Sequence, residues 1–183
     1  GDGRRLSCWR QSVPIASWLY VLGVARFAVE HRPAWKGLPV ETWVFPQDRD
    51  RGFEAFAEPT VAALDFFSSR VGPYPYERLA NVQANGLKGG MEAATSILYG
   101  DDSVSGPSRR WDTVIVHEIA HQWFGNAVTE GDWDDVWLSE GFATYFTHLF
   151  VEHAEGRDAF LAGLRSDRDQ IRAFDLKNPG YRV

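Results

Sequence analysis

The sequence predicts an α+β protein in which strands come first and helices follow. Within residues 1–45, short apolar runs separated by prolines are typical of strands. After Asp50, apolar residues recur at helical spacing over most of the remaining chain. We therefore expect the helices to lie mainly in the second part of the chain.

The first 45 residues contain three runs that we interpret as strands, namely Arg4 to Arg10, Tyr20 to Glu30 and Val40 to Phe45. No group of chemically reactive side chains accompanies them, so we expect this part to be structural. The one cysteine, Cys8, excludes an intrachain disulfide. A reducing compartment fits this count, which favours a cytoplasmic location without excluding export.

The next segment alternates between helix and strand. Asp50 to Val71 keeps its apolar residues on one face, and Gly72 and Pro73 then end the predicted helix. Short strands are predicted at Leu79 to Ala84 and at Ala94 to Tyr99.

Glycines and an acid precede the second of these strands. Gly89 and Gly90 leave the backbone accessible, and an exposed strand edge can bind a peptide by adding it as a further strand. A carboxylate at Glu92 is placed to pair with the charged amino group of such a peptide. By itself, however, a glutamate beside a glycine turn is more often a solvated surface residue.

The pattern HExxH at residues 117–121 is the strongest chemical signal in the sequence. Residues four apart in a helix lie on one face, so His117 and His121 can present two ring nitrogens to a single metal ion. Glu118 flanks that face and is placed to act as a general base toward a metal-bound water.

A catalytic zinc site usually has a third protein ligand and keeps one position for water. Glu140 is the best candidate, because Val136 to Val151 is predicted as a second helix and residues 125–134 can turn the chain back. A further amphipathic helix is expected at Arg157 to Phe174. HExxH alone occurs by chance in helices, but a downstream glutamate makes a one-zinc site the favoured reading.

Composition limits the partners. The net charge of −6 provides no basic surface for nucleic acid, so we expect no such partner. No apolar run is long enough to span a bilayer, because Gly23 and Arg26 interrupt the longest candidate.

Three motifs together resemble the aminopeptidase N family of gluzincin zinc metallopeptidases, which includes leukotriene hydrolase-like enzymes. They are GGMEA at 89–93, HEIAHQWFGN at 117–126 and WLSEGFATYF at 137–146. The resemblance implies a thermolysin-like catalytic domain, a small mixed sheet followed by helices, preceded by the end of an all-β amino-terminal domain. Residues 1–45 would end the β domain, and residues 46–183 would form an incomplete catalytic domain of a chain that is a fragment.

The resemblance also implies roles for individual residues. Zinc would be bound by His117, His121 and Glu140, and Glu118 would be the base. Glu92 would bind the free amino group of a peptide substrate beside Gly89, Gly90 and Met91. Thr144, one turn after Glu140, is placed to contact a zinc-bound histidine.

The implied function is a zinc aminopeptidase. A thermolysin-type zinc endopeptidase and a non-catalytic peptide-binding module are the alternatives. Ala93 departs from the GAMEN form of better-known members, which affects substrate preference. The family's oxyanion-stabilising tyrosine lies further downstream than Tyr181, so the isolated fragment is expected to be weakly active or inactive.

Overall fold

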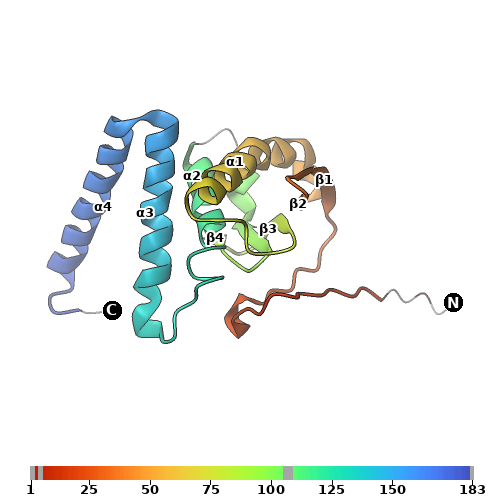
Figure 1. Cartoon of the computed structure of the whole chain (residues 1–183), viewed down its shortest axis with the longest axis horizontal. Coiled ribbons are helices and arrows are strands. Elements are labelled where there is room, and N and C mark those ends of the chain that lie inside the picture. Colours follow the sequence, from red (N-terminus) through yellow and green to blue (C-terminus); the bar gives the residue numbers. More distant parts are fainter. Residues whose placement is uncertain (1–2, 4–5, 105–108, 182–183) are drawn as a thin grey trace.

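A computed structural model describes residue 3 and residues 6–104 and 109–181 of the chain (Figure 1). The strands are β1 (Ala28–Trp35), β2 (Leu38–Val44), β3 (Leu79–Ala84), β4 (Gly90–Met91) and β5 (Ser96–Gly100). The helices are α1 (Arg49–Arg70), α2 (Arg109–Ala120), α3 (Val136–Glu155) and α4 (Arg157–Lys177). Short 3-10 turns are η1 (Ser17–Leu19), η2 (Pro46–Asp48), η3 (Asp101–Val104) and η4 (Trp133–Asp135).

The five strands form one mixed sheet in the order β1-β2-β3-β5-β4. The central pairs β2–β3 and β3–β5 are parallel, and the two edge pairs are antiparallel. The expected α+β fold, with a small mixed sheet followed by helices, is confirmed. Because β2 pairs with β3, the sheet joins residues from both sides of residue 45, and where two domains of a longer protein would meet stays a prediction.

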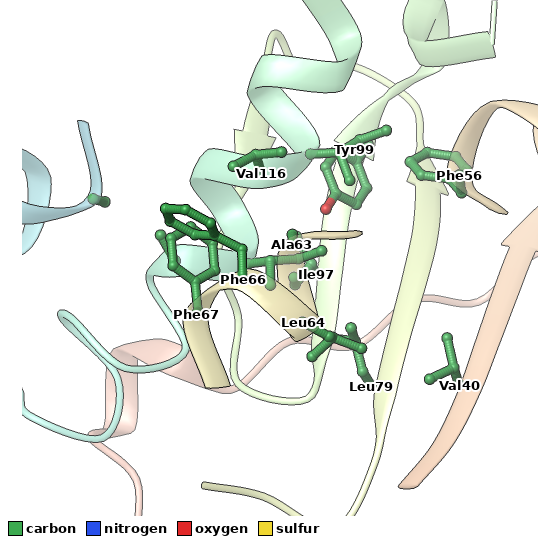
Figure 2. Packing of buried hydrophobic residues seen from close by; sticks show 14 of the residues in the cluster. Val40, Phe56, Ala63, Leu64, Phe66, Phe67, Leu79, Ile97, Tyr99 and Val116 are labelled. Carbon is green, nitrogen blue, oxygen red and sulfur yellow. The ribbon is translucent and has the colours of Figure 1, made fainter. Parts of the chain in front are cut away.

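The main core lies between the sheet and the helices α1 and α2 (Figure 2). Apolar side chains of α1 such as Phe56 and Phe67 are buried there, as the helical pattern predicts. Tyr99 of β5 packs on Phe56, with ring centroids 4.9 Å apart. This core fixes the carboxyl end of α2 against β5 and β4, where the site is built.

The prediction of strands near the amino terminus is partly wrong. Residues 6–16 form no strand, while Arg4 and Arg5 lie outside the described residues. In the run Tyr20 to Glu30 only Ala28 to Glu30 belong to a strand, since the opposing strand β2 begins its pairing at Ala28, opposite Val44. A strand needs a hydrogen-bonding neighbour, and the alternating sequence alone does not supply one.

Helices α3 and α4 run antiparallel and lie side by side, away from the sheet (Figure 1). Gly156 links them, and His148 of α3 pairs with Asp167 of α4 at 2.6 Å. Several of their large apolar side chains remain exposed: Trp137, Phe142, Tyr145, Ile171 and Phe174. Among the described residues, no helix combines the length and apolar character needed to cross a membrane.

Candidate metal centre and substrate site

The two histidines of HExxH meet at the end of α2, as their four-residue spacing predicts. The Nε2 atoms of His117 and His121 lie 3.0 Å apart. Helix α2 ends at Ala120, but the backbone N–H of His121 still donates to the carbonyl of His117 at 3.2 Å. The helical turn is therefore kept through the motif.

Glu140 of α3 completes a triangle of donor atoms. Its Oε2 lies 3.4 Å from Nε2 of His117 and 3.6 Å from Nε2 of His121. Zinc bonds of about 2.0–2.1 Å place two ligand atoms of a tetrahedron about 3.3–3.4 Å apart. The three donors thus match one face of a tetrahedral site, and the group could hold a metal ion.

The three ligand side chains differ in exposure. His121 is buried at 1% exposed, His117 is 23% exposed and Glu140 is 55% exposed. The triangle is therefore sealed on the His121 side and open to solvent on the Glu140 side. An open side is what a catalytic metal site needs for water and substrate.

Mutual contacts shift the protonation of this group. Hydrogen bonds from His117 and His121 hold the pKa of Glu140 well below its usual range. Burial opposes the charged form of His121, but the hydrogen bond to Glu140 and the charges of Glu92, Glu140 and Glu118 raise its pKa overall. Without metal, these contacts therefore favour the charged form of Glu140 and the protonated form of His121.

A backbone carbonyl orients the His121 ring. Nδ1 of His121 lies 3.0 Å from the carbonyl oxygen of Phe124 and 3.2 Å from Oγ of Ser139. Because a carbonyl only accepts, a proton is placed on Nδ1. In the neutral ring, which is the form that binds a metal, the lone pair of Nε2 then faces Glu140 and His117. Gly125 has φ of +104° and leaves no room for a side chain, since a Cβ would overlap Ser139.

Thr144 forms no hydrogen bond with His117 or His121 among the side-chain contacts of the described residues, so its role there stays a prediction. The groups that lie within hydrogen-bond distance of Nδ1 of His121 are the hydroxyl of Ser139 and the backbone carbonyl of Phe124, and sequence reasoning missed both. Ser139 directly precedes Glu140, so one segment of α3 supplies both a candidate ligand and a support for another.

Glu118 lies beside the triangle and is 6% exposed. Burial raises the pKa of Glu118 to about 8, the charge of His121 opposes this rise, and Glu92 and Glu140 add to it. A carboxyl with a pKa near neutrality suits proton transfer at physiological pH. Gly90 lies directly against it, because a Cβ at Gly90 would overlap the Glu118 carboxylate.

The GGMEA segment forms the edge of the sheet next to this centre. Gly90 and Met91 form β4, which pairs only with β5 among the strands described. Gly89 has φ of +81°, a conformation that favours glycine, and its carbonyl accepts from the N–H of Gly100 at 2.9 Å. Glu92 follows β4 and is close enough to raise the pKa of both Glu118 and His121.

Two buried amides just after HExxH hold this segment, and sequence reasoning missed them. Gln122 donates to the backbone carbonyl of Glu92 at 3.0 Å, and Asn126 donates to the same carbonyl at 2.6 Å. Both amide residues are almost fully buried. Their only sequence signal was two polar residues inside an otherwise apolar run.

Known peptidases share sequence similarity with most of this chain. Residues 56–176 match the peptidase family M1 domain. The chain is 34% identical to glutamyl aminopeptidase of Mus musculus over 164 residues, which cover 84% of the chain and 17% of that protein. Against glutamyl aminopeptidase of Bitis rhinoceros it is 32% identical over 178 residues, covering 92% and 18%.

Aminopeptidase N of Canis lupus familiaris is 35% identical over 147 residues, which cover 74% of the chain and 15% of that protein. The chain thus spans less than a fifth of the length of these relatives. The matched region includes β3 to β5, HExxH and Glu140, and so contains every residue of the donor triangle. The chain therefore belongs to peptidase family M1.

Proposed function

We propose that this chain carries the metal centre of a zinc-dependent aminopeptidase, which hydrolyses the first peptide bond of peptides with a free amino terminus. The observation that carries the proposal is the triangle of donors from His117, His121 and Glu140, with sides of 3.0–3.6 Å, beside the buried Glu118. The names of the relatives, glutamyl aminopeptidase and aminopeptidase N, support the same activity.

Each residue has a distinct task in this proposal. His117, His121 and Glu140 would hold the zinc, which when bound lowers the pKa of a water ligand and polarises a substrate carbonyl. Glu118 would accept a proton from the attacking water at its carboxylate and later pass it to the leaving amine. Its contact with Gly90 keeps the base next to the edge strand, where a substrate backbone would lie.

Glu92 distinguishes an aminopeptidase from an endopeptidase. Its carboxylate would pair with the ammonium group of the substrate's first residue, and so set which peptide bond reaches the metal. The edge strand β4 would bind the adjoining backbone through Gly89, Gly90 and Met91. A peptide with a blocked amino terminus lacks the cation and loses this pairing.

The test compares one peptide in free and N-acetylated forms. The rates are measured on a polypeptide that contains this chain at the length of its relatives, with zinc and after removal of zinc by a chelator. We expect zinc-dependent cleavage with a strong preference for the free amine. Equal cleavage of both forms would favour an endopeptidase, and no cleavage with zinc bound would favour a binding module.

A further inference from the structure

Gln122 bridges the two ends of a turn at the edge of the sheet. Strands β4 and β5 are joined by residues 92–95, and the register of the hairpin is Gly90 opposite Tyr99 and Met91 opposite Leu98. The Gln122 side chain donates to the carbonyl of Glu92 at 3.0 Å and accepts from the N–H of Thr95 at 3.1 Å. The Gln122 amide therefore supplies one donor and one acceptor to the backbone at the point where β4 and β5 separate and no longer pair with each other.

Asn126 adds a second donor to the same carbonyl. The distance of 2.6 Å is short for an N–H···O hydrogen bond, and the residue is 2% exposed. A backbone carbonyl has two lone pairs, so it accepts from Gln122 and Asn126 together. Two buried donors on one carbonyl restrict the backbone of Glu92 far more than a strand edge alone.

The same ten-residue segment also carries the metal donors. Residues 117–126 contain the two histidines, His117 and His121, and the two amides, Gln122 and Asn126. Gln122 is covalently next to His121, and its amide also lies 3.4 Å from the carbonyl of Glu118. Any shift of the hairpin relative to the metal centre must therefore break these hydrogen bonds.

We propose that Gln122 and Asn126 are positioning residues that fix the distance between the amine-binding Glu92 and the metal centre. This inference rests on the proposed function. It adds an explanation of how the first peptide bond is selected, because the amides hold Glu92 at a set distance from the metal centre. In this proposal the amides bind neither the substrate nor the metal. They act through the backbone of Glu92, so they affect binding of the free amine and not the chemistry at the metal.

The central variant is Asn126→Ala, measured with the free and N-acetylated peptides in the zinc-loaded protein. Loss of one buried hydrogen bond corresponds to about a tenfold fall in the preference for the free amine. The rate with the acetylated peptide and the zinc content are expected to change little. Gln122→Met, which keeps the side-chain volume without the amide, is the second variant if Asn126→Ala does not fold.

The matched control is Asn81→Ala. Asn81 is also a fully buried amide, but it donates to Oγ1 of Thr60 at 2.9 Å and contacts no candidate site residue through a hydrogen bond. We expect Asn81→Ala to lower stability and leave the substrate preference unchanged. If Asn126→Ala lowers the rates with the free and the N-acetylated peptide by the same factor, as a loss of stability would, the amides are merely structural and the inference is overturned.

A double-mutant cycle with Glu92→Ala separates this inference from the proposed function. Glu92→Ala should abolish the preference, and adding Asn126→Ala should then change it no further. If Glu92→Ala acts as expected but Asn126→Ala alone leaves the preference intact, only the inference fails. If the parent protein shows no preference for the free amine, the proposed function fails and the inference with it.

Discussion

The contact between Gly90 and Glu118 makes a sharp prediction for Gly90→Ala. A Cβ at this position would overlap the Cγ, Cδ and Oε1 atoms of Glu118, and ordinary contact requires a separation increase of about 1 Å. Neither partner can yield easily. Gly90 is paired with Tyr99 in the sheet, and Glu118 lies in a buried turn of α2.

A misplacement of about 1 Å at a catalytic group can lower the rate by about 10²-fold. We therefore expect kcat/KM of Gly90→Ala to fall by about 100-fold, which equals about 2.7 kcal/mol in the activation barrier. Zinc content should be retained, because Gly90 does not contact the donor triangle among its nearest neighbours. The assay is cleavage of a free-amine peptide, with zinc measured by atomic emission on the same sample.

Gly131→Ala is the matched control, because a Cβ there has open space and the residue needs no positive φ. It should leave kcat/KM unchanged. Near-parental activity of Gly90→Ala would refute the reasoning, since Glu118 would then not depend on its contact with β4. Loss of zinc in parallel with activity would also refute it, because the damage would then extend to the metal ligands.

Three further predictions concern the centre itself. Glu118→Ala should reduce turnover by at least about 10²-fold yet keep zinc bound, and zinc loss would remove Glu118 from the role of base. Glu140→Ala should raise the zinc dissociation constant in chelator competition, and unchanged affinity would exclude it as a ligand. In the metal-free protein, stability should fall as pH rises from about 4.5 to 8, since the pKa of Glu118 is higher folded than unfolded and the folded state binds more protons there. Glu118→Gln should flatten this dependence in urea denaturation, and an unchanged slope would contradict the assignment.

The helices were predictable because their signals are local. The apolar periodicity of α1 and α4 matches their observed bounds closely, and Gly72 and Pro73 follow the end of α1 as helix-breaking residues do. The strands β3 and β5 were also found near their true positions. The segment 20–27 was not, because its alternating apolar residues have no strand opposite them.

Sequence spacing predicts only part of the donor triangle. Two histidines four apart must meet on one helical face, so their geometry was fixed by sequence. The approach of Glu140 depends on how α3 packs against α2, which spacing alone does not determine. Glu140 could nevertheless be predicted as the third ligand, because the sequence indicates a second helix and a turn before it.

The supports of the site were beyond sequence reasoning for a physical reason. Gln122 and Asn126 reach a carbonyl 30 and 34 residues away, and a backbone carbonyl has no sequence signature. Likewise, His121 is oriented by the carbonyl of Phe124 and by Ser139, which lies 18 residues further along the chain. Such contacts are set by tertiary packing, so only the structure identifies them.

The exposed side chains of α3 and α4 affect how the isolated chain behaves in solution. Trp137, Phe142, Tyr145, Ile171 and Phe174 present aromatic and aliphatic surface to water. Apolar surface of this kind promotes association between copies as the concentration rises. Light scattering as a function of concentration, and the binding of a hydrophobic dye to the folded chain, should therefore precede any kinetic measurement on it. Rates measured at concentrations where copies of the chain associate would depend on this association as well as on the chemistry.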